Sequence, residues 1–515
     1  MLSLLLFALS TLILAPVISG SRHSTLGPQA QLTVANHIIA PDGYKRSAVL
    51  VNGQYPAPQI RAMKGTRYLL NVVNELTDKT MQRSTSVHFH GIFQRGTPYA
   101  DGTSIVSQCP ITPGKSFLHD FNVLDEAGTY WYHSHFRTQY CDGLRGPFII
   151  YDPLDPHRGR YDVDDESTVI TVGEWYHEPS PAIVINGNPS GNSTLINGKG
   201  RYVGGPKVPL AVVNVQRHKR YRIRLLSISC DPFYIFEIDG HRLTLIEVEG
   251  SNTHPYTIDN VMIHAGQRYS FVLHANQPVG NYWIRALPSS GFNNLRCPIA
   301  DPVTKQKVNG VRLSEANIRP LNNAPAPGKP FPGGADVTLN FNIAVNATNR
   351  RYMMNGVSWE DPSVPVLLQI LSGARDPRNL LPHGSVYTLP RNKVVEITLP
   401  NNLTDTGNPH PFHLHGHAFY VIQSAGNTSM PNYINPPRRD TISLGQFESN
   451  VTIRFLSDNP GPWFLHCHIN WHLQRGLAVV FAEDPWDVPN ETKYTQAWTE
   501  LCPTYNELPL PLQNP

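Results

Sequence analysis

Short runs of β-branched and aromatic residues recur along this chain of 515 residues, and turns rich in proline and glycine separate them. The clearest runs lie at residues 31–34, 68–73, 168–172, 221–225 and 394–399. Such runs between turn residues are typical of β-strands, and long amphipathic helices are few. Because each sheet must bury one face against another layer, the pattern predicts an all-β protein of stacked β-sandwiches.

The length and the placement of prolines predict how the chain divides. A chain of 515 residues is too long for one core and fits about three domains of ordinary size. Prolines interrupt the strand pattern just after Asp152, and residues 319–334 carry too many prolines and glycines for regular ladders. We therefore expect domains at residues 21–152, 153–322 and 323–515.

Residues 1–20 form an apolar, leucine-rich run that ends in small residues, which is typical of a secretory signal peptide. A membrane anchor is the alternative, because the run approaches spanning length and lacks a preceding Lys or Arg. The small residues at its end favour a cleaved signal, cut between Ser19 and Ser24, and hence a secreted protein. Six acceptor triplets for N-glycosylation agree with that fate: Asn192, Asn346, Asn402, Asn427, Asn450 and Asn490.

The charge of the chain argues against nucleic acid as a partner. The formal net charge is only +3 and is not gathered into a basic stripe. After the N-terminal run, no segment is long and apolar enough to span a bilayer, so we expect no membrane partner.

The most informative pattern is the triplet His466-Cys467-His468. On a strand, alternate side chains share a face, so the two histidines point to one side and Cys467 to the other. A thiolate with imidazoles suits a blue-copper centre, and imidazoles alone suit further copper ions. A structural zinc site is the alternative, but such sites usually combine several closely spaced cysteines, whereas Cys467 stands alone among histidines.

Three further His-x-His pairs have the same spacing. One pair alone is weak evidence, because satisfied core histidines are commoner than ligands. Four pairs together, with two further histidines nearby, use ten of the 22 histidines. We interpret them as one group of metal ligands. Its members are His88, His90, His133, His135, His410, His413, His415, His466, His468 and His472, with Cys467.

The clusters also reveal an internal repeat. Residues 128–135 align with 461–468 at an offset of 333, and residues 143–144 then fall on 476–477. The pair at residues 88–90 matches the pair at 413–415 at an offset of 325. Two related domains at the chain ends should therefore face each other across a shared multinuclear copper cluster.

The repeat predicts that only the last domain holds a thiolate site. Its three candidate donors, His410, Cys467 and His472, align with residues that cannot form such a site, namely Thr85, Ser134 and Gln139. The first domain keeps only the histidines that face the cluster.

From about residue 26 onward, the chain closely resembles the fungal (basidiomycete-type) laccases of the multicopper oxidase superfamily, most strongly at residues 86–94, 128–152, 410–418 and 457–477. The resemblance implies three cupredoxin-like β-sandwich domains in tandem and four copper ions. It also implies one-electron oxidation of phenolic or aromatic donors, such as lignin-type phenols, coupled to reduction of dioxygen to water. We expect a monomer.

The same resemblance allocates the ligands to individual coppers, which spacing alone does not. It implies type 1 copper at His410, Cys467 and His472, and type 2 copper at His88 and His413. It gives one type 3 copper to His90, His133 and His468, and the other to His135, His415 and His466.

Three further residues take roles from the resemblance. Leu477 falls at the axial position of the type 1 site, where a side chain that does not coordinate should raise the redox potential. Asp231 matches the carboxylate of the donor pocket and could accept the proton that a phenol loses. Asp101 matches the acidic residue near type 2 copper, which could deliver protons to reduced oxygen. Both aspartates could instead be turn formers.

The resemblance also bears on the 6 cysteines. It implies disulfides between Cys109 and Cys502 and between Cys141 and Cys230, and it leaves Cys297 as a buried free thiol. The chain departs from the usual family pattern at Phe89, Asn470 and residues 474–475. Less negative charge near type 1 copper should raise its potential.

Two other functions remain open on the sequence. Another multicopper oxidase activity, such as that of a ferroxidase or ascorbate oxidase, is the nearest alternative. A copper-storage protein without enzymatic activity is the second, although storage would not need so ordered a two-sided ligand pattern.

Overall fold

The computed structural model describes residues 25–187, 189–289, 310–403, 409–426 and 430–509. The predicted signal peptide, Cys297 and Asn427 lie outside these residues. All five predicted strand runs lie in strands, except that Thr168 ends a short 3-10 turn before its strand. Strands dominate, so the predicted all-β class is confirmed.

The first part of the chain forms two four-stranded sheets. One has the order β2-β1-β4-β6 and the other the order β3-β8-β7-β5. Their bounds are β1 (Gln29–Ile39), β2 (Arg46–Val51), β3 (Ile60–Met63), β4 (Arg67–Glu75), β5 (Val87–His90), β6 (Ser116–Asn122), β7 (Gly128–Ser134) and β8 (Arg145–Tyr151). A 3-10 turn, η2 (Gln139–Asp142), follows β7.

The middle part forms a seven-stranded sheet, β11-β10-β9-β12-β17-β14-β15, and a three-stranded one, β16-β13-β18. The bounds are β9 (Val169–Trp175), α1 (Ser180–Asn186), β10 (Ser193–Ile196), β11 (Lys199–Tyr202), β12 (Arg220–Ser227), β13 (Phe233–Ile238), β14 (Leu243–Val248), β15 (Ser251–Ile258), β16 (Asn260–Ile263), β17 (Arg268–His274) and β18 (Ile284–Ser289).

The last part forms two five-stranded sheets and a small hairpin, β20-β21. The sheet orders are β19-β23-β28-β25-β26 and β22-β30-β29-β24-β27. The strands are β19 (Val337–Asn340), β20 (Ile343–Val345), β21 (Tyr352–Met354), β22 (Val386–Leu389), β23 (Val394–Pro400), β24 (Pro411–Leu414), β25 (Phe419–Gln423), β26 (Arg438–Arg439), β27 (Thr441–Ser443), β28 (Asn450–Leu456), β29 (Gly461–Cys467) and β30 (Ala478–Glu483). The helices are α2 (Val366–Leu371), α3 (Asn470–Gln474), α4 (Val488–Glu491) and α5 (Gln496–Asn506).

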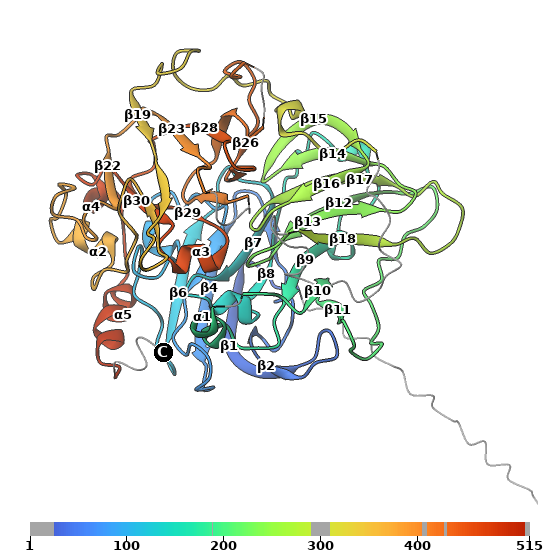
Figure 1. Ribbon diagram of the computed structural model, residues 1–515, viewed down its shortest axis with the longest axis horizontal. Helices are drawn as coiled ribbons and strands as arrows, with labels where there is room; N and C mark the ends of the chain where they lie inside the picture. Colours follow the sequence, from blue (N-terminus) through green and yellow to red (C-terminus); the bar gives the residue numbers. More distant parts are fainter. Residues whose placement is uncertain (1–24, 188, 290–309, 404–408, 427–429, 510–515) are drawn as a thin grey trace, which may run out of the picture.

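The three parts pack as one body (Figure 1). One apolar core joins first-part residues such as Phe89 and Phe148 to Phe464 and Val480 of the last part, and to Trp498 of the tail helix α5. The middle part has a core of its own around β12, β14 and β17. The first and last parts thus share buried surface, which brings the two ends of the repeat together.

Both predicted disulfides are present, so this prediction is confirmed. Cys109 and Cys502 tie the first part to α5, and Cys141 and Cys230 tie it to the middle part. Among the described residues, no helix is long and apolar enough to cross a membrane.

Candidate metal centre

The four His-x-His pairs are carried by two pairs of neighbouring strands. In the first part β5 pairs with β7, and His88 lies opposite His133. In the last part β24 pairs with β29, and His413 lies opposite His466 in the same way. The second histidine of three pairs, His135, His415 and His468, follows directly after its strand.

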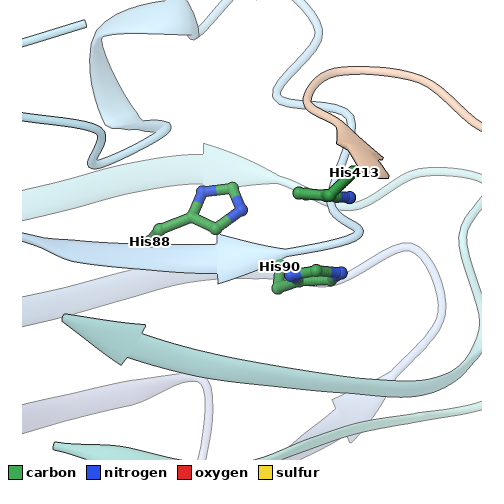
Figure 2. Close-up of side chains that lie close together, drawn as sticks. All are labelled: His88, His90 and His413. Atoms are coloured by element: carbon green, nitrogen blue, oxygen red, sulfur yellow. The ribbon is translucent and has the colours of Figure 1, made fainter. Parts of the chain in front are cut away.

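The histidines of the two ends interleave. Figure 2 shows His88 and His90 on one strand with His413 of the other end facing them. Ligand atoms within 4.8 Å of one another define three sets that span both ends, and Asp101 forms a fourth with His88 and His415. The three histidine sets are His88, His90 and His413; His90, His133 and His468; and His135, His415 and His466.

In most of these rings, one nitrogen is fixed by the protein. Carbonyl oxygens accept from Nδ1 of His88, His133, His413 and His466 at 2.8 to 3.0 Å. Carboxylates bind Nε2 of His90 and Nδ1 of His415, each at 3.0 Å. Such contacts fix the ring orientation and leave the opposite nitrogen as the free electron-pair donor.

Most of the opposite ring nitrogens have no hydrogen-bond partner within the described chain. Five of them are buried without a hydrogen-bond partner: His88 Nε2, His90 Nδ1, His133 Nε2, His413 Nε2 and His468 Nε2. In the remaining set, His466 Nε2 lies 3.4 Å from His135 Nε2 and 3.1 Å from His415 Nε2. Each unpaired buried group costs about 1–3 kcal/mol, so converging nitrogens of this kind fit a bound metal cluster.

For six of these histidines, burial favours the neutral imidazole, which is the form that binds metal. Burial lowers the pKa of His466 to about 3, and the neighbouring His413 adds to the shift. The pKa values of His90, His133, His135, His415 and His468 also lie well below the usual value, chiefly because of burial.

On the other face of β29, the thiol of Cys467 meets two further rings. Its Sγ lies 3.6 Å from Nδ1 of His410 and 3.6 Å from Nδ1 of His472. Burial lowers the pKa of His410 to about 3. Burial raises the pKa of the Cys467 thiol, and Asp231 adds to the shift. One sulfur with two imidazole nitrogens is the donor set of a blue-copper site.

Leu477 and Asp231 lie close to this second set. Leu477 is fully buried, and its backbone bonds both Cys467 and His472. Asp231 is 5 % exposed and follows the disulfide-bonded Cys230. The charge of Asp231 contributes to the raised pKa of the Cys467 thiol, so this carboxylate acts on the set electrostatically.

Asp101 lies against the first cluster. Its Oδ2 is 3.0 Å from His415 Nδ1 and accepts from the hydroxyl of Thr103 at 2.5 Å. Burial alone would raise the pKa of Asp101, but the histidines around it, His88 foremost, hold the pKa below its usual value.

Sequence reasoning missed the residues that hold the cluster from outside. Asp440 bonds His90, and Arg268 of the middle part binds its two oxygens at 2.7 and 2.6 Å. Burial would raise the pKa of Asp440, but Arg268 and His90 hold it well below its usual range. Glu249, also of the middle part, accepts from the backbone nitrogens of Asp440 and Thr441 at 2.8 and 2.9 Å. The middle part therefore orients ligands that it does not supply.

An open cleft of about 260 Å³ reaches the cluster at His135. Arg137, Arg351, Trp359 and Phe464 also line it. This cleft gives small molecules a route from solvent to the buried histidines.

Family models and curated relatives that match this chain are multicopper oxidases. Three family models described as multicopper oxidase match residues 33–155, 166–305 and 359–487. The chain is 54% identical over 502 residues to laccase-2 of Trametes villosa, covering 94% of this chain and 95% of that protein. It is 50% identical to a laccase of Phlebia radiata, covering 98% of both.

A solved structure agrees with these matches. The crystal structure of a laccase from Botrytis aclada superimposes with a TM-score of 0.78 at 30% identity, covering 94% of this chain and 93% of that one. Three cupredoxin-like domains in tandem, as the resemblance implied, describe the fold.

Proposed function

The chain belongs to the multicopper oxidase family, within which it is a laccase of the basidiomycete type, and from this premise we propose that ten histidines and Cys467 hold four copper ions. As a laccase it is an oxidoreductase that binds copper, oxidises small phenolic donors and reduces dioxygen to water.

We propose the following allocation of ligands. His410, Cys467 and His472 hold type 1 copper, and His88 and His413 hold type 2 copper. His90, His133 and His468 hold one type 3 copper, and His135, His415 and His466 hold the other. Two findings support these sets: their donor atoms converge, and one buried ring nitrogen each of His88, His90, His133, His413 and His468 lacks a hydrogen-bond partner in the described chain.

When bound, copper supplies the one-electron steps at the donor site and the electron store for reducing dioxygen. The chain supplies the connection between the two sites. Cys467 belongs to the type 1 set, and its neighbours His466 and His468 belong to the two type 3 sets. A continuous covalent path therefore joins the sites, and the cleft beside His135 gives dioxygen access.

Two carboxylates are proposed to handle protons. Asp231 accepts the proton that a phenol releases on oxidation, which its burial close to the type 1 set supports. Asp101 passes protons toward reduced oxygen, which its contacts with His415 and Thr103 support.

The chain is further proposed to act as a secreted glycoprotein and as a monomer on lignin-type phenols. The two disulfides support an oxidising compartment. Among the described acceptors, Asn402, Asn450 and Asn490 have exposed side chains, which glycosylation requires.

One observation carries the ligand proposal: Cys467 Sγ converges with Nδ1 of His410 and of His472, while its neighbours in sequence face the histidine cluster. Metal analysis with visible and electron-spin-resonance spectra tests it. We expect a blue thiolate band, a coupled copper pair and four coppers per chain. Fully metallated protein with fewer than four would overturn the allocation.

A matched pair of variants sharpens this test. His413→Gln should remove copper from the cluster. His417→Gln should leave the copper count unchanged, because His417, although buried nearby, pairs with Glu483 at 3.1 Å and lies in none of the ligand sets.

The donor preference is tested separately. Oxygen uptake with a methoxyphenol should exceed uptake with iron(II) or ascorbate. The reverse preference would favour a ferroxidase or ascorbate oxidase, and no uptake with copper-loaded protein would favour storage.

A further inference from the structure

The helix that carries His472 is too short to hold its own position. α3 spans five residues, Asn470–Gln474, and no side chain caps its start at Ile469. Isolated helices of this length are unstable in water, so contacts with the rest of the protein must place α3. The position of the His472 ring relative to Cys467 depends on those contacts.

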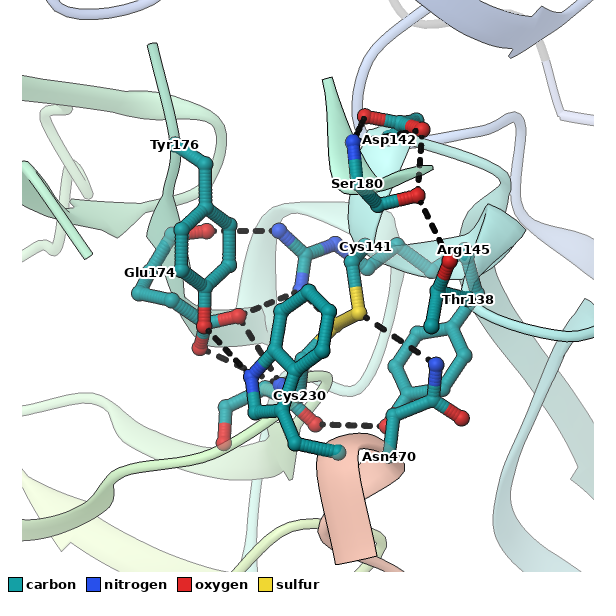
Figure 3. The surroundings of a disulfide bond; sticks show 12 residues. Thr138, Cys141, Asp142, Arg145, Glu174, Tyr176, Ser180, Cys230 and Asn470 are labelled. Atoms are coloured by element: carbon teal, nitrogen blue, oxygen red, sulfur yellow. Dashed lines mark hydrogen bonds and ion pairs between the residues drawn. A yellow bond between two sulfur atoms is a disulfide. The ribbon is translucent and has the colours of Figure 1, made fainter. Parts of the chain in front are cut away.

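The contacts at the start of α3 come from the other two parts of the chain. The backbone nitrogen of Asn470 donates to the carbonyl of Cys230 at 2.9 Å. Its side-chain Nδ2 donates to the carbonyl of Arg137 at 3.1 Å and lies 3.6 Å from the sulfur of Cys141. Figure 3 shows Asn470 meeting the Cys141–Cys230 disulfide in this way.

The two loops that receive Asn470 are themselves locked. The disulfide joins them and is fully buried. Glu174 accepts from the backbone nitrogen of Cys230 at 2.9 Å. Buried Arg145 donates to the carbonyls of Ile228 and Glu174 at 2.5 and 2.6 Å. We call these two loops, with their disulfide, Glu174 and Arg145, the frame. The frame is therefore rigid enough to set the position of α3.

The frame also reaches the histidine cluster. Tyr140 precedes Cys141 in the chain, and its hydroxyl lies 3.2 Å from the carbonyl of Ser229 and 3.2 Å from that of His468. Asp231 directly follows Cys230. The bridge is thus flanked by Tyr140, which contacts the histidine cluster, and by Asp231.

We propose that Asn470 is a positioning residue, which anchors α3 to the Cys141–Cys230 disulfide and so fixes His472 relative to Cys467. The inference rests on the proposed type 1 site. An amide suits this role and a carboxylate does not, because both side-chain partners of Asn470 are acceptors and a carboxylate has no hydrogen to donate. The repeat places Asn470 opposite Arg137, whose carbonyl it binds, so the anchor lies where the two related domains meet.

Two variants remove the anchor, and a third is the matched control. Asn470→Asp keeps the shape but loses the donor and adds charge, and Asn470→Ala loses the donor without charge. Gln474→Glu adds the same charge to the same helix, where Gln474 has no part in the anchor. Hydrogen exchange of the peptide 469–477 is measured in each holoenzyme by mass spectrometry, together with the spin-resonance spectrum and potential of type 1 copper.

We expect exchange in this peptide to rise about tenfold in both Asn470 variants, the factor that corresponds to losing about 1.4 kcal/mol of hydrogen bonding. The type 1 spectrum should change with it, as ligand geometry loosens. In Gln474→Glu, hydrogen exchange of the peptide should match the wild type, while the redox potential of type 1 copper should fall. Peptides around Cys109 and Cys502, the second disulfide, should exchange as in the wild type in all variants.

The proposal is wrong if both Asn470 variants exchange within twofold of wild type, or if Asn470→Asp only reproduces the effect of Gln474→Glu. It is equally wrong if neither Asn470 variant folds, since a positioning residue leaves the fold intact. If Asn470→Asp alone fails to fold, Asn470→Ala decides. A wild-type protein without a type 1 spectrum would refute the ligand allocation instead, and hydrogen exchange would still test the anchor.

Discussion

The two ends of the chain place different chemistry on the same framework. In the first domain the side-chain oxygen of Gln139 accepts from the hydroxyls of Thr85 and Ser134 at 2.6 and 2.7 Å. The amide of Gln139 donates to two backbone carbonyls, at 3.1 and 2.9 Å. In the last domain, the aligned positions hold His410, Cys467 and His472, whose donor atoms converge at 3.6 Å.

The framework around the two sets is the same. Leu144 and Leu477, which the repeat aligns, are both fully buried. The glycines before them, Gly143 and Gly476, both have positive φ, at 129° and 95°. The first set closes its own hydrogen bonds, whereas a thiol between two imidazoles suits a metal ion. The difference between the structural set and the proposed metal site therefore lies in three side chains.

Giving the last domain the serine that the first domain has at the aligned position is expected to have the largest effect. Cys467→Ser places at the thiolate position the residue found at Ser134. We expect loss of the blue band and of one copper per chain, and a fall in phenol oxidation of more than about 100-fold, since even residues behind the ligands are worth 10–100-fold. Visible spectra, copper analysis and oxygen uptake measure this.

The reverse exchange is the control. Ser134→Cys should create no second blue band, because Thr85 and Gln139 provide no imidazole. Retention of the blue band in Cys467→Ser would contradict the comparison.

Removing the hydrogen bonds of Gln139 in the first domain should lower the free energy of unfolding and leave the blue band unchanged. Gln139→Leu leaves two hydroxyls and two carbonyls without their shared partner, at an expected cost of about 4 kcal/mol in the free energy of unfolding. Urea unfolding followed by tryptophan fluorescence measures it, with the blue band as the control. A stability within about 1 kcal/mol of wild type would mean that the set does not hold the first domain together.

The comparison also separates what sequence can predict from what it cannot. Sequence spacing predicts the paired histidines, their strands and the aligned residues of the first domain, because strand geometry fixes which side chains share a face. The runs of β-branched and aromatic residues likewise predict strands elsewhere in the chain, and the five predicted runs, Thr168 apart, lie in β1, β4, β9, β12 and β23.

The support of the cluster could not be predicted in this way. Asp440 and its partners Arg268 and Glu249 are far apart in sequence and follow no spacing rule. Their contacts depend on how the middle domain packs against the others. The anchor of Asn470 on the Cys141–Cys230 bridge has the same origin, since it needs all three domains in place.

His119, a buried histidine outside the cluster, sharpens the comparison, because burial lowers its pKa too. His119 packs between Phe89 and Phe117, with ring centroids 5.2 and 4.8 Å away, and burial lowers its pKa to about 4. Its folded pKa lies below its unfolded value near 6.5, so the stability it contributes is present above pH 6.5 and is lost as pH falls toward 4.

As the pH is lowered from 7 to 4, the free energy of unfolding should therefore fall by about 3 kcal/mol less in His119→Phe than in the wild type. Urea unfolding at a series of pH values measures the difference. His274→Gln, at an exposed site on β17, should follow the wild-type curve. Parallel curves for His119→Phe and wild type would show that His119 is not held neutral by burial.

The smallest structural change tests the aligned leucines. Leu477→Met and Leu144→Met are nearly isosteric, so each should cost less than about 1.5 kcal/mol in stability. Only at residue 477 can the new thioether approach a thiolate–imidazole site, where an axial sulfur lowers the redox potential. Redox titration of the blue band should therefore give a lower potential for Leu477→Met, slower oxidation of poor donors, and no change for Leu144→Met. Equal potentials in both variants and wild type would mean that Leu477 does not occupy the axial position, and the alignment of the two domains would then fail at the residue that tunes the site.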